Sequence, residues 1–187
     1  MPNLGVVIAS VREGRVGLPV AEWFVERVRA HGGFDPTLID LKKVGLPLLE
    51  TPHHPRTQKY EDDRQKAWSA LVKSMDAFVF VTPEYNYFSA PALVNALDHV
   101  YVEWNYKACG FVSYGGPAGG ARAVTMTKAF VTSFKMMPMF ETVLIPVVSQ
   151  RMTEGKFVAD EPLEKAAAVM LTELQRWDGA LASLRSV

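Results

Sequence analysis

A short, uninterrupted apolar run at residues 77–81 constrains the fold of this chain more than any other feature. The run reads Ala-Phe-Val-Phe-Val and is too short to form a buried helix. Apolar runs of this length, rich in β-branched and aromatic residues, are typical of strands that are covered on both faces. Because parallel sheets carry helices on both faces, the run predicts a central strand of a parallel α/β sheet.

Apolar strands and amphipathic helices alternate along the rest of the chain. Strands are expected at residues 4–9, 37–41, 77–81, 109–114 and 143–148. Helices are expected at residues 19–31, 57–74, 91–101, 121–137 and from residue 160 onward, with a small hairpin at residues 153–160. The five βα units predict the α/β class, with a doubly wound five-stranded parallel sheet and helices on both faces. Pro146 lacks an amide hydrogen, so the last strand should lie at an edge or contain a kink.

Composition argues against several classes of protein. The chain has 187 residues, enough for one core, so we expect a single domain over residues 1–187. The 20 basic and 20 acidic residues balance, which argues against nucleic-acid binding and against an acidic electron carrier. The single cysteine, Cys109, precludes an internal disulfide and fits a reducing cytoplasm, where we expect the protein to work.

The sequence predicts neither membrane association nor a metal site. The N-terminal residues show no signal peptide, and no apolar run reaches the roughly 18 residues of a membrane span, so we expect no membrane association. His53 and His54 are adjacent but lack a third ligand at a suitable spacing. We therefore expect no metal site, and interpret this histidine pair as ordinary loop residues.

The loop after the first expected strand has the composition of an anion site. It contains Ser10, Arg12 and Arg15 and leads directly into a helix. A helix N-terminus offers unpaired amide hydrogens and partial positive charge, and serine and arginine add further donors, so phosphate is the expected ligand. A solvated loop with two surface arginines is the alternative.

Two more ligand-suited loops follow expected strands. Residues 82–91 place a carboxylate, aromatic rings and an amide between two prolines, which suits a flat polar ligand. Residues 115–123 are rich in glycine, so the backbone can approach a ligand closely. Open α/β sheets bind ligands at the carboxyl ends of their strands, so we expect the three loops to meet. The alternative for residues 82–91 is an ordinary connection whose aromatic rings pack on the core.

The motifs in these loops resemble those of one family. Pro83-Glu84-Tyr85-Asn86, followed by Leu93-Val94-Asn95-Ala96-Leu97-Asp98, resembles the Pro-Glu-Tyr-Asn and Lys-Asn-Ala-Ile-Asp signature of the NAD(P)H-dependent FMN reductases. Residues 10–15 resemble that family's Ser-x-Arg-x-x-Ser/Arg phosphate loop, and residues 119–123 resemble its Gly-Gly-x-Arg-Ala turn. The resemblance covers about residues 4–145. Phe88 and Val94 depart from it, since serine and lysine are usual there.

The resemblance implies a fold and an activity. It implies a flavodoxin-like sheet of order 2-1-3-4-5, non-covalent FMN, and homodimers or homotetramers. The implied enzyme is an oxidoreductase that takes hydride from NADPH or NADH and reduces a quinone, azo compound, free flavin or similar small acceptor by a ping-pong mechanism. No catalytic side chain is implied, because the flavin carries the chemistry. A flavodoxin-type electron shuttle and a flavin-free regulatory domain on the same fold remain alternatives.

The resemblance also implies which residues bind FMN, in three groups. The first group would hold the phosphate: Ser10, Arg12, Arg15, Val16 and Gly17. The second would flank the isoalloxazine ring: Pro83, Glu84, Tyr85 and Asn86. The third would line the pyrimidine edge of that ring: Ser113, Tyr114, Gly115, Gly116, Gly119 and Gly120.

Residues 101–106 and 44–56 are rich in aromatic and apolar side chains. Both segments are expected to expose apolar surface that a second copy of the chain would bury, with core packing as the alternative for the aromatic rings.

Overall fold

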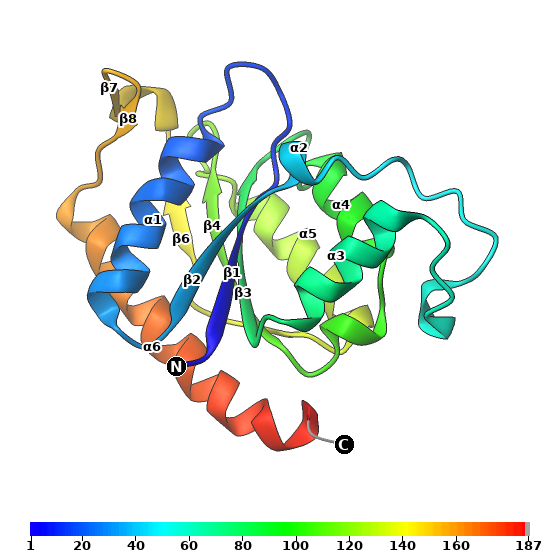
Figure 1. Cartoon of the computed structure of the whole chain (residues 1–187). Helices are drawn as coiled ribbons and strands as arrows, with labels where there is room; N and C mark the ends of the chain where they lie inside the picture. The colour runs from blue at the N-terminus through cyan, green and yellow to red at the C-terminus, as the bar shows by residue number, and fades with distance from the viewer. Residues whose placement is uncertain (186–187) are drawn as a thin grey trace.

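The computed structural model describes residues 1–185 and confirms the predicted parallel sheet (Figure 1). The strands follow in the order β2 (Asp35–Asp40), β1 (Asn3–Ile8), β3 (Ala77–Pro83), β4 (Ala108–Tyr114) and β5 (Met137–Pro138). Each neighbouring pair is parallel. The order 2-1-3-4-5 is therefore as expected. It reverses direction between β1 and β3, and such a reversal opens a crevice at the carboxyl ends of the strands.

Helices cover both faces of the sheet, as predicted. On one face lie α1 (Gly17–His31) and α6 (Glu161–Arg185), and on the other lie α3 (Asp63–Lys73), α4 (Pro91–Asp98) and α5 (Ala121–Val131) (Figure 1). Side chains alternate between the two faces along a strand. In β4, Val112 and Tyr114 pack on the face of α1 and α6, whereas Cys109 and Phe111 pack on the opposite face. Cys109 is completely buried.

The fifth strand is split, which differs from the single strand expected at residues 143–148. β5 pairs with the start of β4, and β6 (Val143–Ile145) pairs with its end. β6 stops at Ile145 because Pro146 has no amide hydrogen to continue the ladder. The predicted edge position of this strand is confirmed, and the predicted hairpin is present as β7 (Met152–Thr153) and β8 (Lys156–Phe157).

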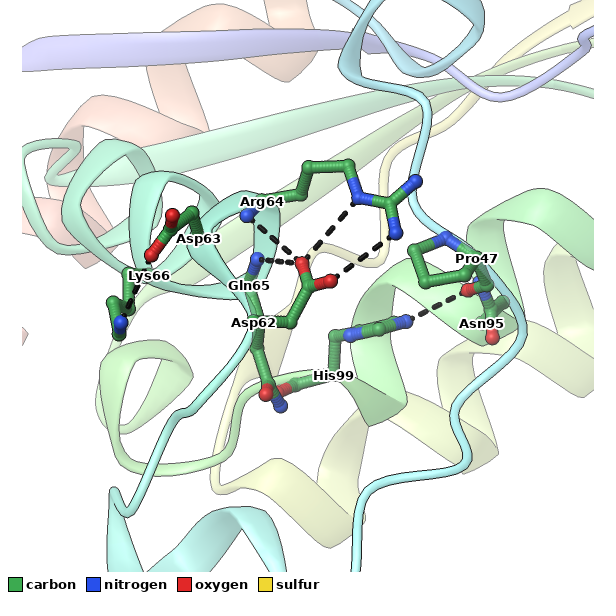
Figure 2. Close-up of polar contacts among 8 residues, drawn as sticks. All are labelled: Pro47, Asp62, Asp63, Arg64, Gln65, Lys66, Asn95 and His99. Atoms are coloured by element: carbon green, nitrogen blue, oxygen red, sulfur yellow. Dashed lines mark hydrogen bonds and ion pairs between the residues drawn. The ribbon is translucent and has the colours of Figure 1, made fainter.

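The helices α3 and α5 differ most in extent from the prediction, and α4 ends at Asp98, three residues earlier than expected. A helix was expected from residue 57, but α3 begins at Asp63, because the Asp62 carboxylate accepts hydrogen bonds from the amides of Arg64 and Gln65 and caps the helix there (Figure 2). Residues before it form a short 3-10 turn, η1 (Pro55–Thr57). The helix expected at 121–137 ends at Val131 and continues as the 3-10 turn η3 (Thr132–Phe134).

The proline-rich segment after α2 (Leu41–Val44) is fastened to α4. The Asn95 side chain donates to the Pro47 carbonyl at 2.7 Å and accepts from the Leu49 amide at 3.0 Å. The ring Nε2 of His99 lies 2.9 Å from the same Pro47 carbonyl (Figure 2). Asn95 and the buried His99 therefore both have structural roles.

Trp104 belongs to the core, which is the core-packing alternative for the aromatic rings of residues 101–106. It lies in η2 (Val102–Trp104), is 1% exposed, and donates its indole hydrogen to the Leu97 carbonyl at 3.0 Å. Its ring packs edge-on against Phe78, with centroids 4.8 Å apart.

Apolar surface is present in the segment at residues 44–56, where Leu48 is 81% exposed. Among the described helices, none is both long and apolar enough to cross a bilayer.

Candidate functional site

A cavity of about 170 Å³ brings distant parts of the chain together at the carboxyl ends of β1, β3 and β4. Its lining comes from the loop after β1, the loop after β3 and the last residue of β4: Ser10, Arg12, Glu13, Gly14, Arg15, Val16, Pro83, Tyr85 and Tyr114. The glycine-rich turn is adjacent, since a Cβ atom on Gly115 would lie 3.6 Å from the Glu84 Cβ. The expected meeting of the three loops is therefore present in the structure.

The N-terminus of α1 forms one wall of this cavity. The cap residue, Val16, makes no side-chain cap hydrogen bond, so the first turn presents backbone amides without a side-chain acceptor. The buried Ser10 hydroxyl lies 2.9 Å from the Tyr85 hydroxyl, which joins the first loop to the second. Arg12 is exposed, lies 5.8 Å from the Tyr85 ring centroid, and forms no ion pair with the residues described. The wall thus combines amide donors with one uncompensated positive charge.

Arg15 lines the same cavity, but its charge is paired. Its guanidinium donates to both carboxylate oxygens of Asp40, at 2.7 and 2.5 Å, and to the Ser10 carbonyl at 2.6 Å. The sequence analysis did not identify Asp40. Asp40 ends β2, which neighbours β1, so the adjacency of the two strand ends was the signal that could have revealed it. Arg15 thus ties the loop to β2, and its expected contact with phosphate stays a prediction.

The second loop is a tight turn in a strained conformation. Tyr85 and Phe88 exchange backbone hydrogen bonds of 2.8 and 3.0 Å across Asn86 and Tyr87. Asn86 and Tyr87 have positive φ values of 50° and 72°. Two-residue turns with positive φ at both positions favour Asn-Gly, and a tyrosine there is strained. Tyr87 is 60% exposed, so this strain presents an aromatic ring at the surface beside the cavity.

Glu84 connects the second loop to α5. Its buried carboxylate pairs with Arg122, accepts a hydrogen bond from the Ala123 amide, and sits at the N-terminus of that helix. Burial opposes ionisation, but the bonds from Arg122 and the Ala123 amide lower the pKa of Glu84. The Arg122 guanidinium also stacks over Tyr87, 4.2 Å from the ring centroid. Glu84 is therefore ionised at neutral pH and positions the loop through its partners.

The glycine-rich turn is shaped by β4. The buried Ser113 hydroxyl donates to the Gly119 carbonyl at 2.8 Å. Gly120 has a φ of 87°, and a Cβ atom there would lie 2.8 Å from that of Ser113. Ser113, Gly119 and Gly120 thus build the turn, whereas Gly116 is exposed at its outer edge. Contact of Gly115 and Gly116 with a flavin stays a prediction.

A larger, mostly apolar groove of about 650 Å³ adjoins the strained turn. It runs between the second loop and the first turns of α5, and its lining residues are Asn86, Tyr87, Phe88, Ala121, Arg122, Thr125 and Met126. Tyr87 and Arg122 were not among the predicted site residues. Within residues 1–185, no group of three histidine, cysteine or acidic side chains is arranged to hold a metal ion.

The family model and the two similar proteins that follow are all FMN reductases. The model of the NADPH-dependent FMN reductase family matches residues 2–150. An NAD(P)H-dependent FMN reductase of Schizosaccharomyces pombe is 39% identical over 121 residues, which are 64% of this chain and 60% of that protein. One of Saccharomyces cerevisiae is 34% identical over 128 residues, 63% of this chain and 67% of that protein. The matched region thus spans about three fifths to two thirds of these relatives.

The fold also has solved counterparts. The flavoenzyme FerB of Paracoccus denitrificans, an NAD(P)H:(acceptor) oxidoreductase, superposes with a TM-score of 0.74 at 17% identity, covering 96% of this chain and 98% of that chain. At this identity the likeness shows a shared fold. Because the family model covers most of the sequence, this chain belongs to the NADPH-dependent FMN reductase family.

Proposed function

We propose that this protein is an FMN-dependent oxidoreductase that oxidises NADPH or NADH and reduces a small acceptor such as a quinone, an azo compound or free flavin. The observation that carries the proposal is the meeting of the loops after β1 and β3 with the end of β4 around one cavity. Membership of the FMN reductase family supports the same activity.

The residues present fit a flavin that bears a phosphate group. Gly17 and the open first turn of α1 provide backbone amides, and Arg12 provides a charge that is not paired within residues 1–185. The hydroxyl of Tyr114 is buried and has no hydrogen-bond partner among these residues, so a donor is available. Ser10, Arg12 and Gly17 would hold the phosphate, since amides and arginine are the usual ligands of that group.

The second loop and the glycine-rich turn fit the flat part of the same molecule. Pro83, Glu84, Tyr85 and Asn86 would flank the isoalloxazine ring, with Gly115 and Gly116 along its edge. When bound, FMN supplies the hydride chemistry, and the protein supplies position and electrostatics. Glu84 holds the second loop against α5 through Arg122, so the loop keeps one geometry when the flavin binds. This role requires no acid, base or nucleophile from the chain.

The apolar groove beside Tyr87 and Met126 is where we place the nicotinamide and the acceptor. Its lining offers an aromatic ring and an apolar wall to planar molecules. If both substrates use this one groove, they must occupy it in turn, which supports a ping-pong sequence. The cytoplasmic location stays a prediction.

We also propose that the protein forms homodimers or homotetramers. Phe140 is 91% exposed and Met126 is 52% exposed, and the Phe140 carbonyl accepts a hydrogen bond from Lys128 on α5. Exposed apolar side chains near a ligand groove are typical of surfaces that another chain covers. Sedimentation at micromolar concentration tests this proposal, and a strictly monomeric species would contradict it.

An absorbance spectrum of the purified protein, followed by anaerobic addition of NADPH and then NADH, tests the activity. We expect a yellow protein that is bleached by one or both nucleotides and recovers its colour when a quinone is added. Colourless protein that takes up no added FMN would overturn the proposal. A flavin-containing protein that neither nucleotide reduces would instead favour the electron shuttle.

A further inference from the structure

Tyr114 lies in a different part of the site from the one that the family resemblance implied. As the last residue of β4, it shares the strand face of Val112, which packs against α1 and α6. Ser113 points to the opposite face and holds the glycine-rich turn. Strand alternation therefore directs the Tyr114 side chain under the N-terminus of α1, away from the turn at residues 115–120.

The Tyr114 hydroxyl is close to the first residue of α1. A Cβ atom added to Gly17 would lie 2.6 Å from this hydroxyl oxygen, so only a glycine leaves room for it. Tyr114 is 5% exposed, and its ring packs in the main apolar core. The hydroxyl thus reaches from the core to the amides that start the helix.

This hydroxyl is the unsatisfied polar group of the cavity. It has no hydrogen-bond partner among residues 1–185, although buried hydroxyls are almost always paired. The nearby Ser10 hydroxyl is already engaged with Tyr85. Burial raises the pKa of Tyr114 and the nearby Tyr85 raises it further, whereas the two loop arginines lower it. The net rise keeps the group protonated at neutral pH, so it can donate.

We propose that the Tyr114 hydroxyl donates a hydrogen bond to the phosphate group of the bound flavin nucleotide, and so distinguishes phosphorylated from unphosphorylated flavin. The inference rests on the proposed function, because it needs FMN as the ligand. The phosphate would then lie between two sets of donors: the backbone amides at the start of α1 and the Tyr114 hydroxyl on the side of the core. Arg12 supplies charge from the solvent side, and Tyr114 supplies a neutral donor from within.

The test compares FMN and riboflavin binding to the flavin-free protein and its Tyr114→Phe variant by fluorescence titration. The phenylalanine keeps the ring and removes only the donor. We expect the FMN affinity to fall about 10- to 100-fold, the usual effect of losing a hydrogen bond to a charged group, with riboflavin affinity unchanged. Inorganic phosphate should compete with FMN, and its inhibition constant should weaken by a similar factor. Tyr106→Phe, two residues before the start of β4, is the matched control and should change none of these values.

A double-mutant cycle tests the geometry without any ligand. Gly17→Ala should lower the thermal stability of the flavin-free protein, because the new methyl group meets the Tyr114 oxygen. In the Tyr114→Phe background the nearest atoms would be 3.4 Å away, an ordinary contact, so the same change should cost much less. Equal losses in both backgrounds would show that the hydroxyl does not occupy this position, and would overturn the inference.

The outcomes separate the inference from the function on which it rests. Wild-type protein that binds no FMN overturns both. Wild-type protein that binds FMN, with a Tyr114→Phe variant that loses FMN and riboflavin affinity equally or loses neither, overturns only the inference.

Discussion

Arg15 and Asp40 form a two-pronged ion pair that joins the loop after β1 to the end of β2, with nitrogen–oxygen distances of 2.7 and 2.5 Å. Both side chains are largely buried, at 11% and 7% exposure. The Asp40 carboxylate also accepts from the Lys42 amide at 3.0 Å and so caps α2. One carboxylate therefore fixes both the candidate phosphate loop and the helix that follows β2.

Removing one partner of this pair should strongly destabilise the protein. Asp40→Asn would leave the buried Arg15 charge uncompensated, and such losses cost about 3–5 kcal/mol of unfolding free energy. Chemical denaturation measures the change. Asp63→Asn, which breaks an exposed pair with Lys66, is the matched control and should cost at most about 0.5 kcal/mol. A loss at Asp40 as small as that of the control would contradict the structural role given to the pair.

The two arginines of the first loop should behave differently. Arg12→Ala should weaken FMN binding about 10- to 100-fold with little effect on folding, because its exposed charge has no partner within residues 1–185. Arg15→Ala should reduce stability first. Titration with FMN and thermal unfolding of both variants separate these effects, and Arg29→Ala, at the far end of α1, is the control. Unchanged FMN affinity in the Arg12 variant would be evidence against the phosphate assignment.

Tyr87 should reveal the strain in the second loop. Tyr87→Gly and Tyr87→Ala both remove the ring that Arg122 covers, but only glycine accepts a φ of 72° without strain. The glycine variant should therefore be more stable than the alanine variant by roughly 1 kcal/mol in chemical denaturation. Both should oxidise NADPH more slowly with a quinone acceptor, because the aromatic wall of the groove is lost. The reverse order of stability would exclude a positive φ at this position.

Lys107 should make the unfolding free energy of the protein depend on pH in the alkaline range. Burial lowers its pKa from 10.5 to about 8, although Asp76 opposes this, and its amine donates to the Val72 carbonyl at 2.6 Å. Between these two pH values the unfolded chain binds more protons, so the unfolding free energy should rise with pH, by an amount on the order of 3 kcal/mol. Chemical denaturation at several pH values measures the rise.

The Lys107→Met variant should lose this rise, since it has no amine to titrate. Lys156→Met, in the exposed hairpin, should keep it. If both variants show the wild-type pH profile, Lys107 is charged in the folded protein at the same pH as in the unfolded chain.

The α/β class and the place of the site could be predicted from the sequence, because apolar runs, amphipathic segments and the loops after the apolar runs are local patterns. The strand order was implied only by the resemblance to the FMN reductase family, and the structure has that order. The extent of α3 was wrong because its first turn depends on a single cap, Asp62, which propensity does not weigh. The split of the fifth strand depends on how residues 137–145 pair with β4, which is a tertiary contact.

Within the site, the sequence indicates which residues lie near the ligand, but not which way their side chains point or which groups they contact. Arg15 was expected to face the ligand, and only the neighbouring strand brings Asp40 to it. The resemblance grouped Tyr114 with the glycine-rich turn, yet alternation along β4 sends its side chain to α1. For Trp104 the sequence left an exposed position and core packing both open, and its burial depends on Phe78 in a strand far away in the sequence.

The split fifth strand also determines how copies of this protein can associate. That border of the sheet is interrupted, with Pro138 in β5 and Pro146 directly after β6, and Pro36 lies in β2 at the opposite border. Prolines and short, broken strands at an edge disfavour the pairing of a further strand from another molecule. Association between copies is therefore expected to use side chains on helices and loops and not the hydrogen-bonding groups of the sheet.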